Sequence, residues 1–113
     1  MILMPIVYVR DMAESVAFYQ RLGFEPDVRS RSNVWTELRA GRGPVLALHA
    51  VAEGAEPGRV ELSMVVEEPL ERVSELAPVA RGIADEAFGR SVVLEDPNRL
   101  RIQVNEHDRE LHA

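Results

Sequence analysis

The sequence predicts an α+β domain made of two βαβββ modules that follow each other along the chain. Three observations predict this class: an internal repeat, two matched junctions at which an apolar strand leads into a helix, and further apolar segments separated by turn residues. The chain has 113 residues, which is the length of one ordinary domain. A domain of this size buries about two-thirds of its unfolded surface, so it can hold a hydrophobic core.

The repeat relates residues 8–16 (YVRDMAESV) to residues 65–73 (VVEEPLERV), and 65 minus 8 gives an offset of 57 residues. Each copy is an apolar strand, then an acid, then the start of a helix. Asp11 is a good N-cap, and Glu14 three residues later completes a capping box. In the second copy Pro69 directly follows the acid, and proline suits the first helical position. Two matched junctions in so short a chain indicate a duplicated module.

Module one covers residues 1–51. Its helix follows the capping box because apolar side chains recur there at helical spacing, and Gly23 suits the position just beyond the helix end. Strands follow, and a turn rich in glycine at 40–44 connects the last two as a hairpin. We expect the helix at 12–22 and the strands at 25–31, 34–39 and 45–51. Residues 52–58 (AEGAEPG) have the composition of a linker.

Module two covers residues 59–105 and repeats the same order of elements. Its helix is short, because Pro78 marks where a helix must already have ended. We expect a strand at 60–66, a helix at 70–76, a weak strand near 79–84 and strands at 90–94 and 100–105. Residues 106–113 form a polar tail, in which His107 and His112 are expected to be solvated.

Composition excludes several classes of protein. The net charge of −6 disfavours nucleic-acid binding, because neutralising phosphates requires a basic face. An acidic protein attracts cationic ligands more readily. The absence of cysteine excludes disulfides, thiolate metal sites and a cysteine nucleophile. No apolar run approaches the roughly 18 residues of a membrane span, and no signal peptide is recognisable, so we expect a cytoplasmic protein without a nucleic-acid or membrane partner.

Two sequence motifs, together with the internal repeat, carry a resemblance to a known family. Residues 8–24 (YVRDMAESVAFYQRLGF) and residues 88–98 (FGRSVVLEDPN) resemble the opening and the late segment of the vicinal oxygen chelate superfamily. That superfamily includes glyoxalase I, extradiol dioxygenases, fosfomycin-resistance enzymes and bleomycin-resistance proteins. The resemblance implies two βαβββ modules whose sheets curl around a cleft. It also implies a homodimer, with the modules either paired within one chain or swapped between two.

Enzymes of the superfamily hold a metal ion with one residue from the first strand and one from the last strand of each module. The matching positions here are Met4, Glu61 and Gln103, with Ala47 or His49 as the fourth, depending on strand register. Hard divalent ions do not favour a methionine thioether. The resemblance therefore implies a broken ligand set, with no metal, no cofactor and no catalytic residue. This chain is most similar to the metal-free, bleomycin-resistance-like branch, whose members bind a drug without chemistry.

Alternation along the strands assigns side chains to the two faces of each sheet. We expect Val7, Val9 and Val104 on the faces that pack against the helices. The cleft faces then carry Met4, Ile6, Tyr8, Glu61, Ser63, Val65, Arg101, Gln103 and Asn105. Phe18, on the first helix, is expected in the core.

Three aromatic residues are candidates for stacking on a planar ligand. Trp35, the only tryptophan, offers the largest face, and Tyr8 and Phe88 are the other two. For each of them, packing in the core or at a dimer interface is the alternative. Further candidate ligand contacts are polar: Glu37, His49, Glu61, Ser63 and Gln103.

The leading functional hypothesis is a metal-independent binding protein that confers resistance by sequestering an aromatic antibiotic, with a cationic group favoured, in a dimer cleft. The alternative is a metal-dependent enzyme of the glyoxalase or dioxygenase type that uses Glu61, Gln103 and His49. A third hypothesis is an accessory subunit without a ligand, which would have a cleft filled by its own side chains.

Overall fold

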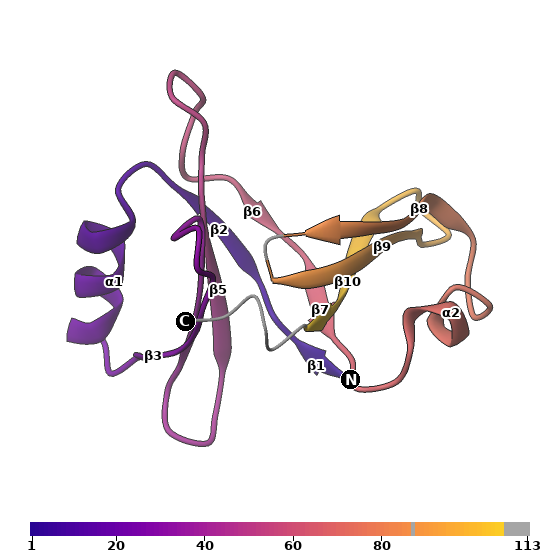
Figure 1. Ribbon diagram of the computed structural model, residues 1–113, viewed down its shortest axis with the longest axis horizontal. Coiled ribbons are helices and arrows are strands. Elements are labelled where there is room, and N and C mark those ends of the chain that lie inside the picture. The colour runs from indigo at the N-terminus through magenta and orange to yellow at the C-terminus, as the bar shows by residue number, and fades with distance from the viewer. Residues whose placement is uncertain (87, 108–113) are drawn as a thin grey trace.

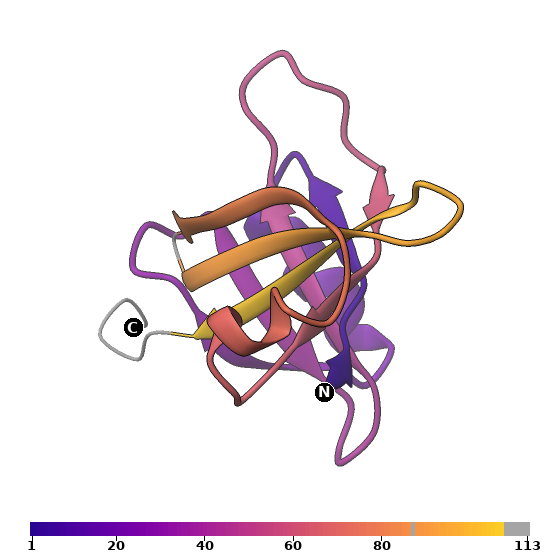
Figure 2. The same ribbon diagram turned by 90° about the vertical axis from the view of Figure 1, so that its right-hand side faces the viewer.

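The computed structural model describes residues 1–86 and 88–107. Two five-stranded mixed sheets lie face to face, and each is covered on its outer side by one helix (Figure 1). The strands of one sheet run steeply across those of the other (Figure 2). The predicted α+β class with two βαβββ modules is therefore confirmed. Among the described residues, no helix combines the length and the hydropathy that a membrane span needs.

Both sheets have the same topology, as a duplicated module requires. Sheet one has the order β3-β4-β5-β2-β6, and sheet two has the order β1-β7-β10-β9-β8. In each, the first long strand pairs in parallel with the last strand of the module, β2 with β5 and β7 with β10. The strands of sheet one are β2 (Ile6–Val9), β3 (Glu25–Arg29), β4 (Trp35–Arg39), β5 (Val45–Ala50) and β6 (Val60–Glu61). Those of sheet two are β1 (Ile2–Leu3), β7 (Ser63–Val65), β8 (Val79–Glu86), β9 (Gly89–Glu95) and β10 (Arg101–His107).

The two sheets are joined by one antiparallel seam. The chain runs from β1 in sheet two into β2 in sheet one, and it returns from β6 in sheet one into β7 in sheet two. The pairing keeps one register throughout, from Ile2 opposite Val65 to Val7 opposite Val60. At the centre, the Met4 amide donates to the Ser63 carbonyl oxygen at 2.8 Å, and the Ser63 hydroxyl donates to the Met4 carbonyl oxygen. The seam therefore fixes how the two modules lie relative to each other within the chain.

Helix α1 (Met12–Arg21) covers sheet one, and it begins as predicted. Asp11 is its N-cap, and the Asp11 carboxylate accepts a hydrogen bond from the Glu14 amide at 2.9 Å. Beneath the helix lies a core cluster of Val9, Val16, Leu38 and Leu48. The expectation for Phe18 was wrong, because its side chain is 47% exposed. Phe18 follows the buried Val16 by two residues, and two residues of helix turn its side chain by about 200°, to the far side.

Helix α2 (Leu70–Val73) covers sheet two and is a single turn, shorter than the predicted 70–76. Pro69 is its N-cap and supplies no capping side chain; the Leu70 amide instead donates to the Glu106 carboxylate at 3.2 Å. Arg90 holds the same carboxylate at 2.8 and 3.0 Å and also binds Glu71 of the helix at 2.8 and 3.0 Å. A charged clamp from β9 and β10 thus fixes this short helix. The core beneath it consists of Val66, Leu70, Val73, Val92 and Val104.

The predicted polar tail begins later than expected. Strand β10 extends to His107, so residues 106 and 107 belong to sheet two. His112 lies outside the described residues.

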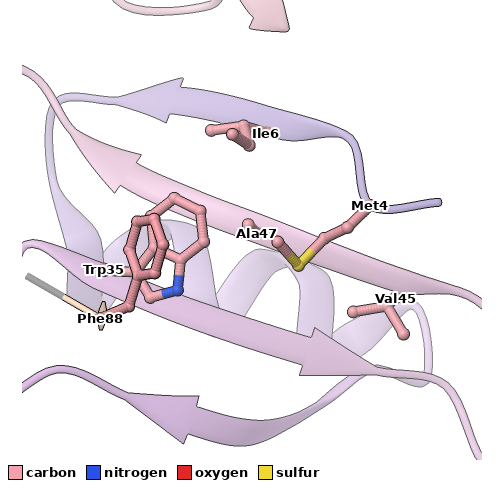
Figure 3. Packing of buried hydrophobic residues seen from close by; sticks show 6 residues of the cluster. All are labelled: Met4, Ile6, Trp35, Val45, Ala47 and Phe88. Atoms are coloured by element: carbon pink, nitrogen blue, oxygen red, sulfur yellow. The ribbon is translucent and has the colours of Figure 1, made fainter. Parts of the chain in front are cut away.

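A third core cluster fills the centre of the space between the sheets. It consists of Met4, Ile6, Trp35, Val45, Ala47 and Phe88, and Figure 3 shows it. The rings of Trp35 and Phe88 stack with their centroids 4.4 Å apart, so the first module contacts the second through this aromatic pair. The Trp35 indole N–H donates to the Glu37 carboxylate at 2.9 Å, which satisfies the buried donor.

Replacing Trp35 with alanine tests the importance of this cluster. The variant removes a side chain that is 1% exposed, and a loss of roughly 3–5 kcal/mol in the free energy of unfolding is expected for such a truncation. Urea unfolding measures it. The control is Phe18→Ala, which removes an exposed ring and is expected to cost far less. Equal losses in the two variants would contradict the placement of Trp35.

The clamp predicts a stability change at acid pH. The hydrogen bonds from Arg90 hold the pKa of the Glu106 carboxyl below its ordinary value of 4.5. A carboxylate with a lowered folded-state pKa stabilises the fold above its unfolded pKa, and this stabilisation is lost as the pH falls through the folded pKa. The melting temperature is therefore expected to fall below pH 4.5, and to fall less over that range in Glu106→Gln. Parallel melting curves against pH for the two proteins would contradict a contribution from this group.

Candidate ligand-binding site

The inner faces of the two sheets have opposite characters. The inner face of sheet one carries the apolar side chains of the central cluster. On sheet two, the alternation that turns Val92 and Val104 toward α2 turns polar side chains inward. Ser63, Ser91 and Asn105 are completely buried there. The wall from sheet one is therefore mainly apolar, with Glu37 buried beside Trp35, and the wall from sheet two is mainly polar.

A pocket opens in this space beside the central cluster. Its volume is about 320 Å³, which lies at the small end of the range of roughly 300–1,000 Å³ for small-molecule sites. Sheet one contributes Tyr8 and Glu61, and sheet two contributes the remaining residues. The lining residues are Tyr8, Glu61, Arg81, Glu86, Val93, Arg101 and Gln103.

Tyr8 lies between two opposite charges. The Arg59 guanidinium carbon is 4.1 Å from the centroid of the Tyr8 ring, and the His49 ring packs against Tyr8 at a centroid distance of 5.1 Å. Burial raises the pKa of the Tyr8 hydroxyl, and the negative charge of Glu61, which also accepts its hydrogen bond, raises it further. Arg59 acts in the opposite direction. Since Arg59 and His49 pack against the ring, the polar end of Tyr8, together with Glu61, is what a ligand would meet.

The polar wall of the pocket is organised by hydrogen bonds. Arg81 donates to the Ser91 hydroxyl at 2.6 Å and lies 3.6 Å from the Glu86 carboxylate. The Ser91 hydroxyl in turn donates to Glu86 at 2.7 Å. Deeper in the wall, the Gln103 amide donates to the Asn105 side-chain oxygen at 2.7 Å. These contacts hold the side chains of β8, β9 and β10 in place before any ligand arrives.

The structure brings together three of the eight predicted ligand contacts, Tyr8, Glu61 and Gln103. His49 instead lines a separate cavity of about 480 Å³ on the other side of Tyr8. The remaining four are almost completely buried and so present no surface to a ligand in this conformation. They are Trp35, Glu37, Ser63 and Phe88, with exposed fractions of 1%, 4%, 0% and 3%.

Four residues of the pocket were not among the predicted contacts. Arg101 could have been predicted from the sequence, because alternation along the strand places it on the same face as Gln103. Arg81 and Glu86 could not, since β8 pairs with β9 through two register shifts that interrupt the alternation. Val93 lies directly opposite both Gln103 and Arg81 across the strands and forms an apolar patch between them.

The positions that hold a metal ion in the resembled enzymes do not fit one here. The pairing of Ile6 with Ala47 matches that of Ser63 with Gln103, so the fourth position is Ala47 and not His49. Met4 and Ala47 are completely buried in the central cluster. Only Glu61 and Gln103 remain, and hard divalent ions need more oxygen or imidazole ligands than these. Within the described ranges, no three His, Asp or Glu side chains come together as a metal site.

The neighbours of Tyr8 predict how its hydroxyl titrates. Glu61→Gln is expected to lower the pKa of Tyr8 toward 10.0, because the negative charge that opposes ionisation is removed. Arg59→Gln is expected to raise it, because the cation that favours the phenolate is lost. Ultraviolet titration of tyrosinate measures both, and Tyr8→Phe identifies the signal that belongs to Tyr8. A Tyr8 titration unchanged in Glu61→Gln would contradict the contact.

Comparisons with known proteins identify the fold. No family model and no curated protein matches the chain. Among solved structures, one from Legionella pneumophila, described as an NAD-dependent benzaldehyde dehydrogenase, is 23% identical with a TM-score of 0.65; the match covers 94% of this chain and 99% of that one. An uncharacterized protein from Methanosarcina mazei is 15% identical with a TM-score of 0.58, covering 96% and 93%. A glyoxalase/bleomycin resistance protein/dioxygenase superfamily member from Vibrio splendidus 12B01 is 20% identical with a TM-score of 0.57, covering 92% and 97%. The chain therefore has the fold of the glyoxalase, bleomycin-resistance and dioxygenase superfamily, the vicinal oxygen chelate fold that its repeat and its two motifs predict.

Proposed function

We propose that this protein binds a small aromatic antibiotic in the pocket between its sheets, without a metal ion, and confers resistance by sequestering it. The observation that carries the proposal is the convergence of Tyr8, Glu61 and Gln103 from both sheets in one cavity of small-molecule size. The fold is one that bleomycin-resistance proteins share, which makes drug binding the leading expectation.

The pocket has the chemistry of a binding site. Glu61 offers a carboxylate to a cationic or hydrogen-bonding group, Gln103 offers an amide, and Val93 offers apolar contact. The positions that would carry a metal are a buried methionine and a buried alanine, so the donor set supports binding more than metal-assisted chemistry. Sequestration requires only that binding lowers the concentration of free drug.

Trp35 and Phe88 have a different role in this proposal from the one expected for them. They stack on each other and fill the centre of the space between the sheets. The third hypothesis, a cleft filled by the chain's own side chains, describes this centre and not the cavity beside Tyr8.

The proposal retains a homodimer and a cytoplasmic location. Ile2 and Leu3 of β1 are 48% and 55% exposed, and β1 is an edge strand of sheet two. Exposed apolar side chains on an edge strand support self-association. The proposed cytoplasmic location fits a protein that intercepts a drug inside the cell.

A thermal-shift screen of the metal-stripped protein tests the proposal. The panel contains bleomycin-, mitomycin- and enediyne-type antibiotics and salts of zinc, nickel, manganese, iron and cobalt. A drug at about one hundred times its dissociation constant adds about 2.7 kcal/mol of stability, which raises the melting temperature by several degrees. We expect such a shift from a drug and none from the metals.

Two variants test whether a bound drug occupies the pocket. Glu61→Gln and Tyr8→Phe are expected to weaken binding about tenfold, as expected for losing a hydrogen bond to a charged group. Glu67→Gln, on the exposed surface, is the matched control and is expected to bind normally. A shift with metals alone, or drug binding that is the same in Glu61→Gln and in the wild type, would overturn the proposal.

A further inference from the structure

We propose that the ligand of this pocket is a small aromatic zwitterion, with its ammonium group at Glu61 and its carboxylate at Arg101. This inference rests on the proposed function and adds to it the chemical class of the ligand. It comes from the charges that line the pocket and from the pocket volume.

Four charged side chains line the pocket, two acidic and two basic. One pair is already satisfied within the protein. Arg81 lies 3.6 Å from Glu86, donates to the Gly82 carbonyl oxygen at 2.9 Å and shares the Ser91 hydroxyl with Glu86. Arg81 and Glu86 thus compensate each other's charge within the wall of the pocket. We therefore do not assign ligand recognition to this pair.

The other pair, the half-buried Glu61 and the exposed Arg101 at the pocket edge, makes no such contacts with the residues that the structure describes. Glu61 lies two residues before Ser63, and Arg101 lies two residues before Gln103. Ser63 and Gln103 pair with each other across β7 and β10, so alternation places Glu61 and Arg101 on the inner face as well. Both line the pocket, yet in the part of the chain that the structure describes neither makes an ion pair. The contact of Glu61 is the Tyr8 hydroxyl.

Two opposite charges that share a pocket without pairing favour a ligand that carries both signs. A carboxylate or a guanidinium leaves water at a cost unless a partner replaces the water. A cationic ligand would compensate Glu61 and leave Arg101 without a partner, and an anionic ligand would do the reverse. A zwitterion gives both side chains a partner of opposite charge. The local charges thus refine the expectation from the net charge of −6, which favours cations in general.

The pocket volume limits the size of the ligand. About 320 Å³ is at the lower end of the range for small-molecule sites, roughly 300–1,000 Å³. An aromatic amino acid or a drug of similar size fits such a space.

A matched series of four compounds tests the charge requirement. Phenylalanine carries both charges, phenethylamine only the positive one, hydrocinnamate only the negative one and hydrocinnamamide neither. Calorimetric titration of the full-length protein measures the dissociation constants. We expect phenylalanine to bind at least tenfold more tightly than each of the other three.

Two variants assign the charges to residues. Arg101→Gln is expected to abolish the preference for phenylalanine over phenethylamine, and Glu61→Gln its preference over hydrocinnamate. The matched controls Arg42→Gln and Glu67→Gln change exposed residues outside the pocket and are expected to keep both preferences.

The results that overturn this inference differ from those that overturn the proposed function. Equal affinity for phenylalanine and either singly charged compound, a preference that persists in Arg101→Gln, or no binding of the series would each overturn the zwitterion. An antibiotic that binds in the first screen and is weakened by Glu61→Gln would leave the proposed function standing in all of these cases.

Discussion

The antiparallel seam between residues 2–7 and 60–65 is the constraint on which the rest of the structure depends. Each βαβββ module has only one helix for its one sheet, so each sheet has a second face to bury. The seam places these two faces opposite each other, because each module's leading strand continues into the other's sheet. The two hydrogen bonds between Met4 and Ser63 lie at its centre and hold the two backbones together there. The stacking of Trp35 on Phe88 and the pocket beside Tyr8 both follow from this placement.

The two facing sheets bury different kinds of side chain on their inner faces. Sheet one contributes large apolar side chains, which pack against one another and against Phe88. Sheet two contributes serines, amides and charged groups, which must be hydrogen-bonded to be buried without penalty. Most of them are, through chains such as Arg81–Ser91–Glu86. The Asn105 side-chain nitrogen has no partner among the described residues, although it is completely buried. Such a wall favours specific polar recognition, because its hydrogen bonds leave the polar side chains few alternative positions.

In the enzymes that the sequence resembles, a few strand positions of this fold carry the metal ligands. Here the positions in module one carry Met4 and Ala47, which have joined the apolar core. The positions in module two keep Glu61 and Gln103, which face the pocket. The duplication has therefore diverged at these matched positions: those of module one pack in the core, and those of module two supply polar groups. A fold built from two equivalent halves thus acquires a pocket with unequal walls.

The sequence by itself determined most of the local structure and, on the regular strands, which face each side chain takes. The capping box at Asp11 and Glu14 predicted where α1 begins, and alternation correctly placed Tyr8, Glu61 and Gln103 on inner faces. These are properties of neighbouring residues, so a pattern in the sequence contains them. Only the tertiary structure decided how deeply each of these side chains is buried. Trp35, Phe88 and Tyr8 all lie in the layer between the sheets, but the first two are buried there and a cavity opens at the third. Depth depends on what covers a side chain, and that cover comes from residues distant in the sequence whose position the seam sets.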